Sequence, residues 1–574
     1  MGTKQTLTPQ NSVLYINLAE DIIDSPMLSP VGSVDIMNMN YVAPITLRQA
    51  LTAIENAATD EAIKGICIRP DGVGSISSTI IEELRLAIEK FKLSGKFVVA
   101  YDDYYSQGDY YLATAADQIY LQPEGSVDWR GVSLTTMFYK GLLDKLDAEV
   151  DIFRPTVCRY KSAVEPFFLK KMSPENRKQM EAIAESIWET LCEDVAESRG
   201  VKVEALKSYA ANLDIVLGED AVRCGLIDAL TYEDELYTLL ESYGVERDSR
   251  GHLNSTTLGE YVLANNFSVT TVTTEEDFAL EFIDKPLVAV IYANGQIVDG
   301  DAYMDGNIYG TTLAREIRQA RLDERTKAVV VRVNSPGGSA LASDVVWREM
   351  KLLQETKPVV ISMGEMAASG GYYISAPADV IVANKMTLTG SIGVFGMMLN
   401  LEKCLSNKLG ITIDNAATSK EATPPSLFTS VSEAQRKALM EGVDRVYTTF
   451  TSKVAEGRNL SIERVYEIAE GRVWTGRDAK EIGLADMNGG FTEAISTAAN
   501  LADLGSDFVI YEFTAPLTPF EQWINSMGMI TAKSLGLNYD MYGTQIEEVI
   551  GSAHELINMQ GIQARCVGEP KIEL

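Results

Sequence analysis

Short apolar segments alternate with longer amphipathic segments along most of this chain, most clearly in its second half. Apolar, β-branched segments predict strands over residues 287–292, 328–333, 359–362 and 380–383. Amphipathic segments predict helices over residues 311–320 and 343–355, and a further helix that starts near Ala368. The strands are continuously apolar, which is typical of parallel sheets covered by helices on both faces. The pattern therefore predicts an α/β fold with largely parallel sheets flanked by helices.

The same succession of segments occurs twice. Residues 64–69 (KGICIR) correspond to residues 327–332 (KAVVVR), and residues 96–100 (KFVVA) correspond to residues 357–361 (KPVVI). Further along, GEDAVRCGLID corresponds to GRDAKEIGLAD. A repeat of this length indicates duplicated domains rather than a solenoid. We therefore interpret the chain as a tandem duplication.

Five parts follow from this duplication. We expect an N-terminal extension over residues 1–12, a first repeat over 13–248, a polar connector over 249–285, a second repeat over 286–500 and a tail over 501–574. In the tail, aromatic residues and methionines over residues 516–537 predict an amphipathic helix. We expect this helix to pack onto the protein body or a neighbouring subunit rather than onto a membrane.

Charge and cysteine spacing exclude several classes of protein. The 574 residues carry a net charge of -31, from 81 acidic and 50 basic residues. Such a surface repels nucleic acid and anionic lipid, so we expect neither as a partner. The six cysteines form no CxxC pair and predict no metal site. No apolar run approaches the ~18 residues that cross a bilayer, so we expect no transmembrane anchor within this chain.

One segment of the second half has a degraded copy in the first. Residues 365–373 read EMAASGGYY, and residues 105–111 read YSQGDYY. Aligning Gly370 with Gly108 places Gln107 opposite Ser369. Only the second half therefore has a hydroxyl nucleophile at this position, because an amide side chain cannot serve as one.

The surroundings of Ser369 suit acyl-transfer chemistry. The serine follows a predicted strand and precedes a predicted helix, whose free N–H groups and dipole favour a developing negative charge. The amide of Gly370 can supply one donor to that charge. The turn NSPGGS over residues 334–339 can supply a second donor, from Gly337 or Gly338. The alternative is that both glycine-rich turns only link a strand to a helix.

A serine nucleophile needs a general base to accept its proton. The chain has two histidines, His252 in the connector and His554 in the tail, so neither lies in a repeat. This position argues against a Ser-His-Asp triad. Lysine is the remaining base for a serine nucleophile, and it must be neutral to accept a proton. Fifty lysines and arginines leave too many candidates for composition to choose between them.

Four motifs carry a resemblance to a known family. They are MAASGGYY over residues 366–373, NSPGG over 334–338, LTGSIG over 388–393 and YKSAVEP over 160–166. Together they resemble the double-length members of the signal peptide peptidase A family, also called protease IV. The resemblance extends from about residue 13 to residue 500. It implies a tandem duplication of ββα-superhelix domains of the Clp protease and crotonase superfamily.

The resemblance also assigns roles to residues. Ser369 matches the family nucleophile, Lys161 its lysine base, and Ser391 a serine that orients the lysine. Gly338 and Gly370 match the oxyanion-hole glycines. In double-length members the lysine comes from the first half and the serine from the second, which accounts for Gln107.

Lys420 is an alternative base. It occupies roughly the corresponding place in the second half, where single-length relatives have their lysine. We favour Lys161, because its flanking residues match the family motif better and because Lys420 adjoins Glu421.

The resemblance implies a serine endopeptidase without a cofactor. Its expected substrates are signal peptides left after protein export, and other unfolded hydrophobic peptides. It implies a homo-oligomer, a tetramer in the double-length form, at the bacterial inner membrane with its catalytic domain on the periplasmic side. Membrane association would use an N-terminal anchor that is not present in this chain. Two alternatives remain open from the sequence: a crotonase-like acyl-CoA enzyme and a noncatalytic assembly scaffold.

Overall fold

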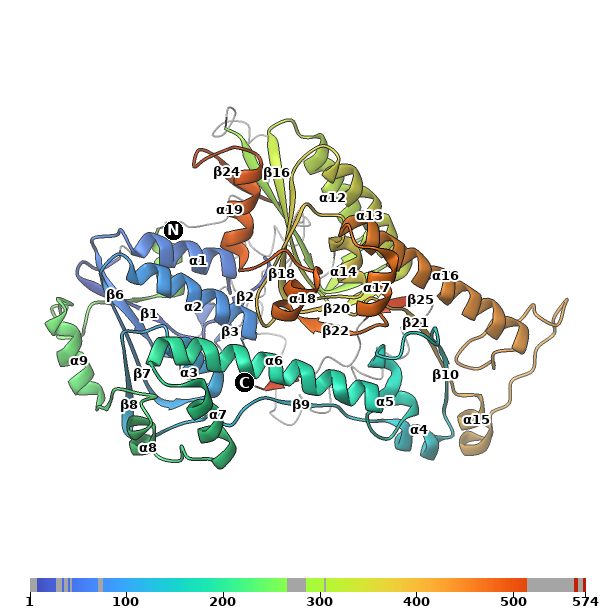
Figure 1. Ribbon diagram of the computed structural model, residues 1–574, viewed down its shortest axis with the longest axis horizontal. Coiled ribbons are helices and arrows are strands. Elements are labelled where there is room, and N and C mark those ends of the chain that lie inside the picture. The colour runs from blue at the N-terminus through green and yellow to red at the C-terminus, as the bar shows by residue number, and fades with distance from the viewer. Residues whose placement is uncertain are drawn as a thin grey trace.

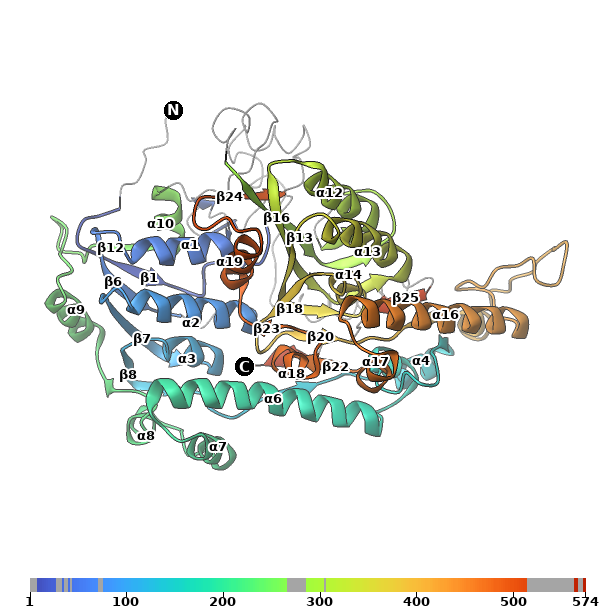
Figure 2. The same ribbon diagram turned by 45° about the horizontal axis from the view of Figure 1, so that its top comes forward.

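A computed structural model describes residues 8–26, 34–35, 40–41, 44–70, 76–265, 285–303, 306–513, 562–565 and 571–573. The two halves lie side by side, and one long helix runs along both of them (Figures 1 and 2). His554 and the helix expected over residues 516–537 lie outside the described residues.

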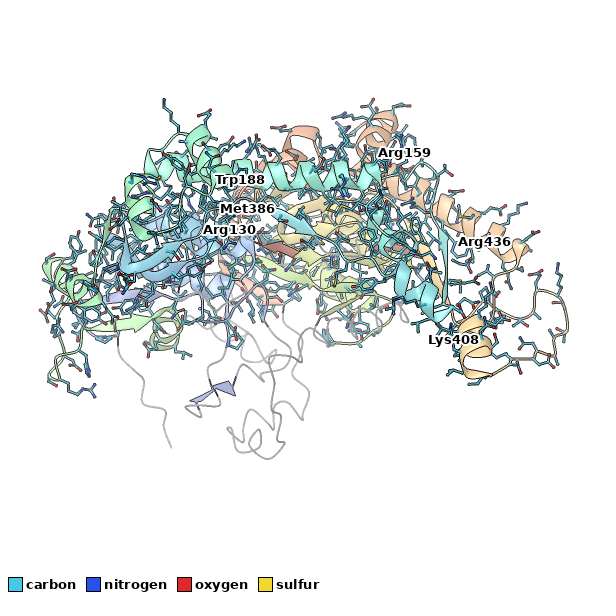
Figure 3. The ribbon with its side chains drawn as sticks, turned by 90° about the horizontal axis from the view of Figure 1, so that it is seen from below. Arg130, Arg159, Trp188, Met386, Lys408 and Arg436 are labelled. Atoms are coloured by element: carbon cyan, nitrogen blue, oxygen red, sulfur yellow. The ribbon has the colours of Figure 1, made fainter. Side chains whose placement is uncertain are left out.

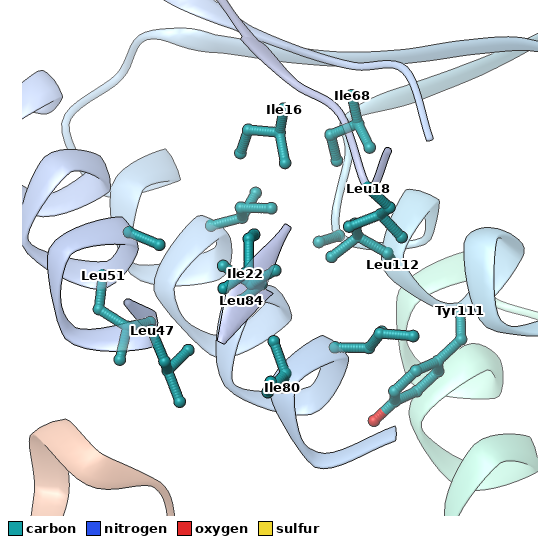
Figure 4. Close-up of a cluster of buried hydrophobic side chains, with 14 of the residues drawn as sticks. Ile16, Leu18, Ile22, Leu47, Leu51, Ile68, Ile80, Leu84, Tyr111 and Leu112 are labelled. Carbon is teal, nitrogen blue, oxygen red and sulfur yellow. The ribbon is translucent and has the colours of Figure 1, made fainter. Parts of the chain in front are cut away.

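The first half is built on a parallel sheet of six strands. Their order is β11 (Ala229–Leu230), β8 (Gln118–Val127), β7 (Phe97–Tyr105), β6 (Ile63–Ile68), β1 (Ser12–Ile16) and β12 (Ser255–Thr257). Its helices include α1 (Leu47–Ala57), α2 (Ser78–Lys92), α3 (Gln107–Ala113) and α10 (Leu258–Ala264). In Figure 4, Leu47, Ile80 and Leu84 of α1 and α2 lie beneath Ile16 and Ile68 of the sheet. The apolar face of each helix therefore closes the core of this half.

The second half repeats this plan with a larger sheet. Its order is β22 (Val473–Thr475), β20 (Leu388–Gly390), β18 (Val359–Ala368), β16 (Thr326–Ser335), β13 (Leu287–Asn294) and β24 (Val509–Phe513), with β19 (Val380–Ala383) and β23 (Met487–Asn488) beside β18. Of these pairings, only β20 with β22 is antiparallel. Its helices include α12 (Gly310–Leu322), α13 (Ala340–Gln354), α14 (Gly370–Ser375), α16 (Glu433–Gly457), α17 (Ile462–Ile468), α18 (Gly476–Ile482) and α19 (Phe491–Leu501).

A third sheet combines segments from distant parts of the chain. Its order is β10 (Glu149–Phe153), β21 (Phe395–Asn400), β25 (Ile562–Arg565), β17 (Gly337–Ser339), β14 (Gln296–Val298) and β15 (Asn307–Tyr309). Strand β10 belongs to the first half, and β25 lies near the end of the chain. Shorter strands pair as β2 (Ile22–Ile23) with β5 (Ile45–Thr46), β3 (Val34–Asp35) with β4 (Asn40–Tyr41), and β9 (Ser133–Thr135) with β26 (Lys571–Glu573).

Helix α6 (Pro174–Arg199) is the long helix that joins the halves. Ser173 caps its first turn by accepting from Asn176 N, Pro174 occupies its first position, and Gly200 ends it in a left-handed conformation. Its 26 residues correspond to ~39 Å of helix, enough to run along both halves (Figure 1). Helices α7 (Val203–Asn212), α8 (Gly218–Arg223) and α9 (Glu233–Ser242) follow it, and α4 (Lys140–Leu146) and α5 (Glu165–Phe168) precede it.

The halves share a core and a buried ion cluster. The largest hydrophobic cluster includes Ile66 of the first sheet together with Val330 and Val360 of the second. The guanidinium of Arg332 is buried with the carboxylates of Asp24 and Glu83, at 2.6 Å and 2.9 Å. Because both carboxylates come from the first half, the two repeats form one body.

The predicted strands and helices of the second half are present, and the two α/β repeats with largely parallel sheets are confirmed. Most boundaries lie within two residues of the sequence expectation, and two differ by three residues or more. Strand β18 continues past residue 362 to Ala368, so α14 begins at Gly370. Helix α13 begins at Ala340 rather than 343, because Ser339 Oγ accepts from Ala342 N and caps it there. No helix within the described residues is long and apolar enough to cross a membrane.

Candidate active site

Ser369 lies at the junction of β18 and α14 in a strained backbone conformation. Its φ is 56° and its ψ is -111°, which a residue with a Cβ rarely adopts. Its N–H donates to Gly390 O at 2.8 Å, which ties the junction to β20. The side chain is fully buried. Strain of this kind persists only where the surrounding structure enforces it, and it marks functional sites.

Lys161 extends from the first half to this serine. Its Nζ lies 2.7 Å from Ser369 Oγ, 2.9 Å from Ser391 Oγ and 2.9 Å from Ser391 O. The side chain is 1% exposed. The lysine and both serines were candidates from the sequence, and the fold brings all three together.

The main chain around Lys161 is held by residues from both halves. Arg154 Nη1 donates to Lys161 O at 2.7 Å, and Tyr160 N donates to Glu470 O at 3.1 Å. Gly471, with a φ of 79°, lies directly against the lysine, because a Cβ built there would be 2.5 Å from Lys161 Cβ. The loop between α17 and β22 therefore supports the main chain at Lys161.

Further bonds connect this loop and the start of β22 to the first half. Arg159 lies at the second-half end of α6 (Figure 3), and its guanidinium pairs with Glu470 at 2.9 Å. Buried Gln179 of α6 accepts from Val473 N at 2.9 Å. The segment around Lys161 and the second repeat are thus joined on both sides of Gly471.

Ser391 is positioned by the same loop. Its φ is 49°, and its N–H donates to Arg472 O at 2.7 Å. This geometry presents both the hydroxyl and the carbonyl of Ser391 to Lys161 Nζ. Three oxygens thus surround the amine and fix its position.

Two glycines lie near Ser369. Gly338 in β17 has a φ of 156°, and a Cβ there would lie 1.9 Å from Ile297 O, so only glycine fits. Gly370 is the first residue of α14, which contacts β17. Both therefore lie close to the strand end that carries Ser369.

The equivalent strand–helix junction in the first half is arranged differently. Gln107 starts α3 at the end of β7, and its Oε1 accepts from Arg130 N at 3.2 Å and Gly131 N at 3.0 Å. The preceding Ser106 has an ordinary φ of -61°. The side-chain amide of Gln107 thus accepts hydrogen bonds from two N–H groups of a neighbouring loop. The backbone strain seen at Ser369 is absent here.

The remaining candidates lie elsewhere. Lys420 is exposed in the loop between the helical turn Leu405–Leu409 and α16. This loop extends beyond the body of the second half (Figure 1). His252 is exposed and lies beside Asp248. Burial raises the pKa of the Cys158 thiol to about 11, so this neighbour of Lys161 stays protonated near neutral pH. Among the residues whose placement is given, no group of three acidic, histidine or cysteine side chains is arranged to hold a metal.

Sequence reasoning missed Arg154, Gln179 and Gly471. The first two form hydrogen bonds to main-chain groups, and such bonds leave no motif in a single sequence. The only available signal was a glycine at position 471 with no turn pattern to explain it.

Comparisons with known proteins agree with this architecture. The chain matches Peptidase family S49 over residues 90–246 and again over 351–505. It is 35% identical over 526 residues to Protease 4 of Haemophilus influenzae, covering 89% of this chain and 83% of that protein. It is 31% identical over 541 residues to the chloroplastic serine protease SPPA of Arabidopsis thaliana, covering 93% of this chain and 76% of the relative. A mutant ClpP1 from Listeria monocytogenes is similar over 38% of this chain and 99% of its own length, with 12% identity and a TM-score of 0.25.

These relatives settle the class of protein. The duplicated α/β fold and the two family matches define a serine peptidase. The chain belongs to peptidase family S49.

Proposed function

We propose that this peptidase uses a dyad in which Ser369 is the nucleophile and Lys161 is the general base. The single observation that carries the proposal is the 2.7 Å separation between Lys161 Nζ and Ser369 Oγ inside a buried site. Burial disfavours the charged form of an amine, and a neutral lysine can accept the serine proton. The first half then supplies the base and the second half the nucleophile.

The reaction follows from this assignment. Lys161 takes the proton of Ser369 as Oγ attacks the scissile carbonyl, and the amides of Gly338 and Gly370 stabilise the oxyanion. Lys161 then gives the proton to the leaving amine, which departs and leaves an acyl-enzyme. In the second stage Lys161 deprotonates a water that attacks the ester and releases Ser369. Ser391 keeps the amine aimed at Ser369 in both stages.

The proposed substrates are signal peptides left after protein export, and other unfolded hydrophobic peptides. The motifs shared with the signal peptide peptidase A family support this choice. We also propose that the protein works as a homotetramer associated with the bacterial inner membrane, with its catalytic domain on the periplasmic side. That resemblance alone supports the assembly and the location.

Substitution of three residues tests the dyad. Ser369→Ala and Lys161→Ala should each lower kcat/KM for a fluorogenic peptide by roughly 10³-fold or more, because each removes a group required in the transition state. Lys420→Ala is the matched control and should retain the activity of the unmodified protein.

Labelling gives a second readout. A fluorophosphonate probe should label the unmodified protein and the Lys420→Ala variant at Ser369, and Ser369→Ala should stay unlabelled. If Lys161→Ala kept its turnover while Lys420→Ala lost it, Lys420 would be the base instead.

A further inference from the structure

Ser335, the last residue of β16, bonds the strand of the proposed oxyanion hole to a neighbouring turn. Its side chain is fully buried, and its register partner in β18 is Ala367, close to Ser369 along the chain. Its Oγ donates to Gly295 O at 2.6 Å and accepts from Gly337 N at 3.1 Å. The hydroxyl therefore connects the start of β17 to the turn between β13 and β14.

Ser335 also packs against the helix that follows the nucleophile. A Cβ built at Gly371, the second residue of α14, would lie 2.8 Å from Ser335 O. Gly371 adjoins Gly370, and Ser335 shares the turn over residues 334–339 with Gly338. Ser335 therefore contacts the segments of both glycines whose amides are proposed to stabilise the oxyanion.

Ser339 holds the other end of β17. Its Oγ donates to Asp299 Oδ1 at 2.6 Å and accepts from Ala342 N at 3.2 Å. Asp299 directly follows β14, the strand in which Ile297 lies opposite Gly338. The hydroxyls of two serines thus hold β17 on either side of Gly338, and each bonds to a residue that flanks β14.

The peptide group between Gly337 and Gly338 requires such bonds to keep its orientation. The φ angles of the two residues are 97° and 156°, and neither has a Cβ that restricts rotation of this group. A rotation of the peptide plane would turn the Gly338 N–H away from the developing oxyanion. Donors that are held in place before the reaction stabilise this charge best, because they need no reorganisation as it forms.

We propose that Ser335 is a positioning residue for the oxyanion hole, and that Ser339 and Asp299 support the same strand from its other end. This inference rests on the proposed function of Ser369 and Lys161. Ser335 acts through the Gly338 N–H rather than on the substrate itself. Its contribution is therefore larger in the transition state, where the substrate oxygen is charged, than in the bound peptide.

Substitution of Ser335 separates positioning from binding. We expect Ser335→Ala to lower kcat for a fluorogenic peptide by about 10²-fold and to change KM by less than about threefold, because a displaced oxyanion donor weakens the transition state selectively. The matched control is Ser12→Ala in the first half. Ser12 is also fully buried and donates to a main-chain carbonyl, Ala62 O at 3.4 Å, so this variant should keep the kcat of the unmodified protein.

A transition-state analogue gives a readout that a merely structural role would not change. A peptide boronic acid adds reversibly to Ser369 Oγ and becomes tetrahedral, which places one of its oxygens at the oxyanion position. We expect Ser335→Ala to raise the Ki of this inhibitor by about the factor by which kcat/KM falls. The Kd of the substrate peptide, measured with Ser369→Ala added to both proteins, should stay unchanged. Equal changes in Ki and Kd, or no change in either, in a folded Ser335→Ala protein would overturn the proposal.

Asp299 provides a test that leaves the buried residues intact, because its side chain is exposed. Asp299→Ala removes the acceptor of the Ser339 hydroxyl, and we expect kcat to fall by about fivefold. Asp299→Asn keeps an oxygen acceptor and should retain the kcat of the unmodified protein. If Ser335→Ala does not fold, these two variants decide the proposal, and equal kcat values for them would overturn it. A boronic acid that did not inhibit the unmodified protein would instead contradict Ser369 as the nucleophile, and this inference would fail with that assignment.

Discussion

The contact between Gly471 and Lys161 shows how closely the lysine is held. A Cβ at position 471 would lie 2.8 Å from both Lys161 N and Lys161 Cα, in addition to its clash with Lys161 Cβ. All three are atoms near the main chain, so no side-chain rotation can relieve the contact. The lysine is therefore positioned by the shape of the loop beneath its backbone.

Gly471→Ala should displace Lys161 and reduce activity. We expect kcat/KM to fall by about 10²-fold, because a shift of ~1 Å in a catalytic group has that effect. The matched control is Gly95→Ala, since Gly95 has a φ of 81°, close to the 79° of Gly471, and open space around it. Both variants bear similar backbone strain, but only Gly471→Ala adds the clash with Lys161, so its melting temperature should fall further than that of Gly95→Ala. Equal kcat/KM values in the two variants would mean that Gly471 has no positioning role.

Sequence motifs predicted Ser369, Lys161 and Ser391 as a group because each lies in a long and specific motif. They could not predict Gly471, which lies against main-chain atoms of Lys161 more than 300 residues away along the chain. Contacts of this type depend on the docking of two loops. Nothing in the local residue pattern of either loop records them.

At the scale of elements, α2 is joined to the second half by a buried carboxylate. Glu82 accepts from Lys385 N at 2.9 Å and from Met386 N at 3.2 Å, in the turn between β19 and β20. Burial raises the pKa of Glu82 to about 7, and the charge of Asp194 adds to this, while the two N–H groups and the charge of Lys385 oppose it. The folded protein therefore holds a proton on Glu82 that the unfolded chain releases near pH 4.5.

This raised pKa predicts a pH dependence of stability. Between about pH 4.5 and pH 7 the folded state binds more protons than the unfolded state, so the free energy of unfolding falls as pH rises. The loss attributable to Glu82 is on the order of 3 kcal/mol across this window. Relative to Glu82→Gln, the unmodified protein should become steadily less stable from pH 5 to pH 8 in urea unfolding. A difference between the unmodified protein and Glu82→Gln that stays constant with pH would contradict the prediction.

Elements followed the hydrophobic pattern where they are long and buried on both faces. Strands β13, β16 and β19 fall where continuous apolar residues predict them. The third sheet was not predicted, because its strands are short and β17 consists of Gly337, Gly338 and Ser339. Its register is set by partners from four distant parts of the chain, and no local periodicity carries that information.

At the scale of the whole molecule, the two repeats interlock through contacts at several places. Strand β10 of the first repeat pairs with β21 of the second, and Arg436 of α16 forms an ion pair with Asp151 of β10. Lys408, at the same end of the molecule in Figure 3, pairs with Asp147 at 3.2 Å. The duplication could be predicted from the sequence, because equivalent segments of the two repeats match. The exchange of segments between the repeats could not, because such a match does not show which segments contact each other.

The interlocked repeats predict that the dyad forms within one chain. Mixing Lys161→Ala with Ser369→Ala should restore no turnover, because an intact Lys161 in one chain cannot reach an intact Ser369 in another without unfolding the shared core. The measurement is hydrolysis of a fluorogenic peptide by the two variants expressed together and by each alone. Recovered activity would show that repeats from different chains pair with each other.

The distance between the two members of the dyad along the chain has a consequence for biosynthesis. Lys161 precedes Ser369 by 208 residues, and the loop between α17 and β22, which supports the lysine, is translated later still. At ~5–20 residues per second, a ribosome needs roughly 10–40 s to travel from the lysine codon to the serine codon. Because the proposed dyad is complete only once the loop between α17 and β22 is translated, nascent chains that end before this loop should have no dyad-dependent peptidase activity.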